Sequence, residues 1–115
     1  MSESRFAGTP KPPYYAVIFS SQRNGRGEAD YEAAGERMFV MVQQQPGFLG
    51  VESTRDEHGF GITVAYFDSE QNILKWRNHP DHAATRERGK REWYEHFEVR
   101  VAKVERAYNG PRSGG

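Results

Sequence analysis

The 115-residue chain contains no cysteine. A disulfide framework, a thiolate nucleophile and a cysteine-ligated zinc site are therefore excluded. It also has no excess charge of either sign, because 16 lysines and arginines balance 16 aspartates and glutamates. No net positive field attracts nucleic acid or anionic lipid, so we expect neither nucleic acid nor membrane as a partner.

Long apolar runs and nucleotide-binding motifs are missing as well. No stretch approaches the roughly 20 apolar residues of a membrane-spanning helix, and the N-terminus lacks a signal peptide pattern. We therefore expect a cytoplasmic protein. The Gly59-Phe60-Gly61 sequence is a turn rather than a dinucleotide fingerprint, and no GxSxG sequence surrounds a serine. These absences exclude nucleotide-dependent and acyl-transfer enzymes.

Aromatic residues, in contrast, are abundant at 13%, with seven phenylalanines, six tyrosines and two tryptophans. Large rings supply much buried surface per residue, and they also line pockets for flat organic ligands. The sequence leaves both uses open.

The chain is predicted to form one domain between two tails. Residues 1–13 contain Pro10, Pro12 and Pro13 among small polar residues, which is typical of a disordered tail. Residues 109–115 are expected to form a flexible C-terminal tail. The domain then spans residues 14–108.

Hydrophobic periodicity predicts an alternation of strands and helices within this domain. Strands are expected at 14–20, 48–55, 60–67 and 95–108, with a bulge or bend after Val101, where the apolar phase slips. A helix is expected from Glu28 to about 45. A second helix, capped by Asp68 or Ser69, is interrupted at Pro80 and continues as an offset piece to about 91. This order predicts an α+β, ferredoxin-like split βαβ fold, with a four-stranded antiparallel sheet and helices on one face.

Two of the predicted strands, 14–20 and 60–67, are apolar on both faces. Helices can cover only one face of the sheet, and the other would expose a large apolar patch. We therefore expect a homodimer in which a second copy covers this face, so that the two sheets share one barrel-like core.

The break at Pro80 concentrates the residues with potential chemistry. His79 and His82 are too few to hold a metal, and Pro80 disturbs their spacing, so no metal site is predicted. His82 is the main candidate for a base acting on a phenol or quinol, and His79 and Trp76 are the other candidate catalytic residues. Equally, one histidine could cap the new helix while the other packs over the break, and Trp76 could be a core ring.

Further residues are candidates for contacts with a flat substrate. The aromatic ones could equally be core rings, and the basic one belongs to a run that could be a solvated helix end. They are Phe19, Tyr66, Phe67, Trp93 and Arg86.

Three segments carry a resemblance to a known family. They are QPGFLGVES (Gln45–Ser53), ITVAYFDSEQNILKWRNHPDH (Ile62–His82) and WYEHFEVRVAKVERAY (Trp93–Tyr108). From about Tyr14 to Tyr108 the chain resembles the antibiotic biosynthesis monooxygenase family of dimeric α+β barrels.

The resemblance implies an apolar pocket between sheet and helices, in which O₂ oxidises a small aromatic or quinol-like molecule without any cofactor. A haem-degrading branch is also implied, and Trp76 matches its tryptophan. However, Arg86 stands where that branch has histidine, and the first strand has no asparagine. A non-catalytic module that binds a hydrophobic ligand or responds to stress, and a structural or accessory subunit, remain as alternatives.

Overall fold

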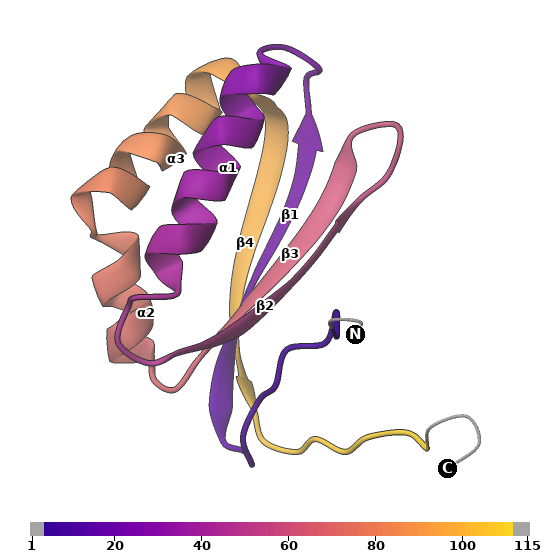
Figure 1. Ribbon diagram of the computed structural model, residues 1–115, viewed down its shortest axis with the longest axis vertical. Coiled ribbons are helices and arrows are strands. Elements are labelled where there is room, and N and C mark those ends of the chain that lie inside the picture. The colour runs from indigo at the N-terminus through magenta and orange to yellow at the C-terminus, as the bar shows by residue number, and fades with distance from the viewer. Residues whose placement is uncertain (1–3, 112–115) are drawn as a thin grey trace.

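The computed structural model describes residues 4–111, so parts of both predicted tails, 1–3 and 112–115, lie outside the described residues. The elements in chain order are β1 (Tyr14–Arg23), α1 (Glu28–Val42), β2 (Phe48–Arg55), β3 (Phe60–Phe67), α2 (Glu70–Arg77), α3 (Pro80–Glu92) and β4 (Tyr94–Val104). The strands form one antiparallel sheet in the order β2-β3-β1-β4. All three helices lie on one face of this sheet (Figure 1). The predicted ferredoxin-like α+β fold is confirmed.

The break between α2 and α3 follows from local hydrogen bonding. The Ser69 hydroxyl caps α2 by accepting a hydrogen bond from the backbone N–H of Asn72 at 3.1 Å. Pro80 has no N–H to donate and occupies the first turn of α3, where none is needed. The His79 ring caps α3, because its Nδ1 accepts from the backbone N–H of Asp81 at 3.2 Å. Two short helices therefore replace one long one.

The main core lies where α1 and α2 meet the sheet. Phe67 is 1% exposed and packs with Val42, Ile73 and Trp76, each 8% exposed. Phe48 closes the β2 side with its ring edge-on to Phe67, at a centroid distance of 5.7 Å. Each large apolar side chain buried in this way contributes about 1.5–3 kcal/mol.

The pairing of β1 with β4 differs from the prediction in two places. β1 continues through Arg23, three residues beyond the predicted end, because the Arg23 side chain is buried and its backbone N–H bonds to the Gly59 carbonyl at 2.9 Å. The prediction of a bulge after Val101 is wrong. The pairing of β4 with β1 runs unbroken from Val104 to His96 and shifts only at the other end of β4. The apolar residues at 102 and 104 therefore belong to the opposite face of the sheet from Val101.

The face of the sheet away from the helices carries apolar side chains from β1 and β3. Ile18 pairs with Val64, Phe60 is 47% exposed and Ile62 is 39% exposed. In the described part of the chain no helix covers this face (Figure 1). None of the helices within residues 4–111 has the length and apolarity to cross a membrane.

Candidate functional site

The helix break brings a tryptophan and two histidines together. The His82 ring stacks on the Trp76 indole at a centroid distance of 4.2 Å and an interplanar angle of 9°, and the His79 ring lies 5.6 Å from the same indole. Trp76 itself is buried in the core, whereas His79 and His82 are half-buried. Trp76 is thus a core ring, the His79 ring caps α3, and the half-buried His82 ring stacks on Trp76.

The protonation state of His82 is set by its surroundings. Burial is the largest effect and lowers the pKa of the ring below its usual 6.5, and the positive charge of Arg86 lowers it further. The Trp76 carbonyl lies 2.9 Å from Nδ1 and opposes this effect. At neutral pH the ring is therefore uncharged, so Nδ1 must carry the proton that it donates to this carbonyl. Nε2 is left as a proton acceptor.

The spacing of His82, Arg86 and Gly89 places them along one face of α3. This face is turned toward the sheet at its Gly89 end, because a Cβ added to Gly89 would lie 2.9 Å from the Tyr94 ring. Arg86 donates from Nη2 to the Arg77 carbonyl at 2.9 Å, while its buried Nε has no hydrogen-bond partner among residues 4–111. A proton acceptor and a guanidinium therefore share one face of the helix.

An apolar strip of β1 and β4 lies on the helix-bearing side of the sheet. Strand register places Val99 opposite Phe19 and Val101 opposite Val17, a residue that packs against the core. Val99 and Val101 nevertheless remain 52% and 51% exposed. The Phe19 ring contacts Tyr94 and Phe97, each at 5.4 Å. The helix-bearing side therefore presents accessible apolar surface.

The remaining predicted substrate contacts do not gather in one place. Phe67 and Trp93 are almost fully buried, and Trp93 lies beneath the start of α1 with its ring 5.6 Å from Tyr31. Tyr66 belongs to the opposite face of the sheet, where its hydroxyl donates to Glu52 at 2.8 Å. Burial, followed by this carboxylate, raises the pKa of Tyr66 to about 12. Only Phe19 and Arg86 of these candidates combine a place on the helix-bearing side with partial exposure.

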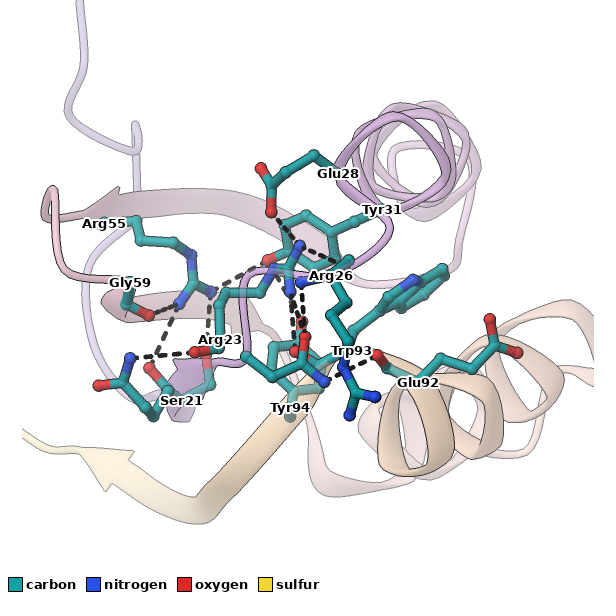
Figure 2. Close-up of polar contacts among 12 residues, drawn as sticks. Ser21, Arg23, Arg26, Glu28, Tyr31, Arg55, Gly59, Glu92, Trp93 and Tyr94 are labelled. Atoms are coloured by element: carbon teal, nitrogen blue, oxygen red, sulfur yellow. Dashed lines mark hydrogen bonds and ion pairs between the residues drawn. The ribbon is translucent and has the colours of Figure 1, made fainter.

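A cluster of two arginines and two tyrosines was not predicted from the sequence. The arginine-tyrosine cluster consists of Arg23, Arg55, Tyr31 and Tyr94 and lies where β1 and β2 end beside α1 (Figure 2). The Arg23 guanidinium is 3.9 Å from the Tyr31 ring centroid, and Arg55 donates to the Tyr31 hydroxyl at 3.0 Å. Burial and the bond to Tyr31 raise the pKa of Tyr94. The only sequence signal was a polar Ser-Gln-Arg stretch, which is typical of a loop.

Metal ligands do not converge in the described residues, since no three histidine or acidic side chains between positions 4 and 111 form a group able to hold an ion. Two surface depressions, of about 250 and 270 Å³, lie elsewhere. One is at the end of the uncovered sheet face and is lined by Phe60, His96 and Glu98 among others; the other lies at the β2 edge beside Phe6 and Phe39. Neither includes the stacked His82.

Comparison with known proteins agrees with this architecture. Residues 13–88 match the profile of the antibiotic biosynthesis monooxygenase family. The chain therefore belongs to the antibiotic biosynthesis monooxygenase family.

Among individual relatives, the uncharacterized protein YqjZ of Bacillus subtilis is 53% identical over 98 residues, which cover 85% of each chain. SnoaB, a cofactor-independent oxygenase from Streptomyces nogalater, has a similar structure with a TM-score of 0.70 and 12% identity, over 84% of this chain and 97% of SnoaB. Protein SO0527 from Shewanella oneidensis has a TM-score of 0.72 and 12% identity, over 83% of this chain and 94% of SO0527. At these identities the solved structures show a shared fold.

Proposed function

We propose that this chain is a cofactor-independent monooxygenase acting on a small aromatic or quinol-like molecule. Family membership and the fold shared with a cofactor-independent oxygenase support this class of reaction. The observation that carries the proposal is the His82 ring, which is uncharged at neutral pH and fixed by both Trp76 contacts. A positioned base of this kind is what such a reaction requires from the protein.

In the proposed reaction, Nε2 of His82 removes the proton from an acidic O–H or C–H group of the substrate. The resulting substrate anion transfers one electron to O₂, and the substrate radical and superoxide combine to form a C–O bond. Protonation gives a hydroperoxide, and loss of water leaves a carbonyl group. One oxygen atom enters the product and the other leaves as water, so no external reductant is consumed.

Four further residues are proposed to contact the substrate. Arg86 lies on the same face of α3 as His82, and its cation would stabilise the negative charge that proton removal creates. Phe19 and the exposed Val99 and Val101 would hold the apolar part of a flat molecule. Trp76 acts through His82, as a positioning residue that orients the imidazole.

A second copy of the chain is proposed to cover the exposed part of the sheet face that lies away from the helices. The exposed Phe60 and Ile62 side chains and the paired Ile18 and Val64 form an apolar surface that favours such an isologous contact. Light scattering at micromolar concentration should give the mass of a dimer. A monodisperse monomer would remove this part of the proposal.

Oxygen uptake tests the catalytic proposal. Metal-chelated, flavin-free protein is mixed with 1,8-dihydroxyanthrone or a substituted hydroquinone, and the protein-free rate is subtracted. His82→Ala should lower the rate at least about tenfold, the low end for loss of a general base. His58→Ala is the matched control, because His58 is an exposed turn histidine with 84% of its side chain accessible.

Other outcomes point to other functions. Saturable quenching of tryptophan fluorescence without a product would identify a binding module, and neither signal would indicate a structural or accessory subunit. A haem titration with no Soret shift would exclude haem as a ligand. An unchanged rate in His82→Ala would remove His82 from the mechanism.

A further inference from the structure

The arginine-tyrosine cluster has more positive charge than the protein around it neutralises. Arg23 is paired with Glu28, and its guanidinium also donates to the Trp93 carbonyl at 2.8 Å. Arg55 forms no ion pair with any residue between 4 and 111; its partners are all neutral oxygens, on Ser21, Gly59 and Tyr31. A partly buried cation without a carboxylate is a natural partner for an anion.

The hydrogen bonds within the cluster leave the hydroxyl proton of Tyr31 available. The Tyr31 hydroxyl accepts from Arg55 at 3.0 Å and from the Tyr94 hydroxyl at 3.3 Å. Its own proton has no acceptor in the described part of the chain. Since a phenol O–H is also a donor, Tyr31 can give a hydrogen bond to an oxygen placed beside Arg55. Figure 2 shows both groups on the same side of the cluster.

The sheet is built to hold the Arg55 guanidinium in place. A Cβ at Gly61 would lie 2.8 Å from Cζ of Arg55, so the glycine gives the guanidinium room to lie across β3. The Gly59 carbonyl accepts from Nη1 at 2.7 Å, and the buried Ser21 hydroxyl accepts from Nη2 at 2.9 Å. These contacts fix the orientation of the cation before any ligand arrives.

The next row of the sheet offers surroundings suited to an aromatic ligand. The strand register places Ser53, Thr63 and Phe19 side by side, one step along the helix-bearing face from Arg55. The Ser53 and Thr63 hydroxyls bond to each other at 2.6 Å at an exposed position. Beside them, the Phe19 ring and its neighbours Tyr94 and Phe97 form an aromatic wall. A flat ring can thus contact this wall while an oxygen reaches the cation.

We propose that Arg55 and Tyr31 bind the negatively charged oxygen of an aromatic ligand, a carboxylate or a phenolate, with its ring against Phe19. This site lies at the end of the sheet where β3 begins, whereas the stacked His82 lies near the end where β3 finishes at Phe67. Its charged and hydroxyl groups are therefore separate from the proposed catalytic histidine and do not depend on it, whereas the Phe19 ring is shared with the proposed substrate surface.

Isothermal titration with 2-naphthoate and its uncharged analogue 2-naphthamide tests the site. Wild-type protein should bind the carboxylate at least about tenfold more tightly, as expected for a charge-assisted hydrogen bond. Arg55→Gln should abolish this preference and Arg55→Lys should retain part of it. Arg106→Gln is the matched control, because Arg106 is exposed and lies beyond the end of β4.

Tyr31→Phe provides a test that does not depend on the folding of the Arg55 variants. It keeps the ring beside Arg23 and removes only the O–H, so it should weaken 2-naphthoate binding several-fold and leave 2-naphthamide unchanged. If wild type shows no preference for the carboxylate, or if Arg55→Gln or Tyr31→Phe preserves it, the proposal is wrong.

The two tryptophans report where the probe binds. In an ¹⁵N-resolved NMR titration assigned with Trp76→Phe, the indole N–H signal of Trp93 should shift with 2-naphthoate, because Trp93 lies against Tyr31. The Trp76 signal should change little. A shift confined to Trp76 would place the probe at the His82 end and overturn the assignment. Oxygen uptake is measured separately, so failure of this site leaves the monooxygenase proposal intact.

Discussion

Two glycines in different helices should respond in opposite ways to the same change. Gly35 lies at an exposed position of α1, and a Cβ added there meets no atom within 4 Å. Gly89 is buried in α3, and its added Cβ would lie 2.9 Å and 3.1 Å from two carbons of the Tyr94 ring. Gly35→Ala therefore only gains helix propensity. Gly89→Ala gains the same propensity but also introduces a steric clash with Tyr94.

The magnitudes decide the sign. Replacing glycine by alanine inside a helix stabilises by about 0.8–1.0 kcal/mol. Overpacking a filled site costs about 1–3 kcal/mol. The Tyr94 ring cannot move aside easily, because the rings of Phe19, Tyr31 and Phe97 surround it at 5.4–5.9 Å. We expect Gly35→Ala to stabilise by about 1 kcal/mol and Gly89→Ala to destabilise by up to about 2 kcal/mol.

Thermal and urea unfolding measure both effects. The protein concentration is kept the same for every variant, so that the proposed dimerisation affects all of them equally. One kcal/mol corresponds to about 4–8 °C in Tm for a domain of this size. Propensity largely cancels between the two variants, so their difference reports the contact between α3 and Tyr94. If Gly89→Ala were as stable as Gly35→Ala, this packing of α3 on the sheet would be refuted.

Three other perturbations probe the helix break. Trp76→Ala should cost about 3–5 kcal/mol in urea unfolding, as for other large core rings, and Trp76→Phe should cost less. Ser69→Ala should lose about 1 kcal/mol through the missing cap, whereas Ser4→Ala, which removes only an exposed acceptor for the Phe6 N–H, should lose much less. Because folding lowers the pKa of His82 below 6.5, the unfolded chain binds more protons at mildly acidic pH. Stability from this group is therefore complete above about pH 6.5 and declines as the pH falls toward the folded pKa. In His82→Gln, the free energy of unfolding should depend less steeply on pH between pH 5 and 7.5, because the contribution of this ring is missing.

The fold could be predicted because its signals are local. Alternating apolar residues, the Pro80 break and the serine before α2 each specify their element through nearby backbone geometry. The extension of β1 could not be predicted in this way. The sequence of residues 21–23 is typical of a loop. It forms a strand because the Arg23 side chain bonds to the Trp93 carbonyl, far along the chain, and to Glu28, across a loop.

The candidate site was predicted only in part. The helix break was found from Pro80, but which histidine caps and which stacks depends on how α2 and α3 pack against each other. The arginine-tyrosine cluster was missed, because Arg55 and Tyr31 are 24 positions apart and meet only across the folded sheet. Similarly, alternation predicted two apolar faces for β3 without indicating that Tyr66 would lie away from the helices, beside Glu52.

In the proposed reaction this chain uses O₂ directly, with His82 as the base. Incubation of metal-chelated, flavin-free protein with 1,8-dihydroxyanthrone under ¹⁸O₂, followed by mass spectrometry of the early product, tests this reaction. We expect one ¹⁸O atom per product molecule, formed at least about tenfold more slowly by His82→Ala and at the wild-type rate by His58→Ala. Product formation no faster than without protein, or equal rates for wild type and His82→Ala, would contradict it.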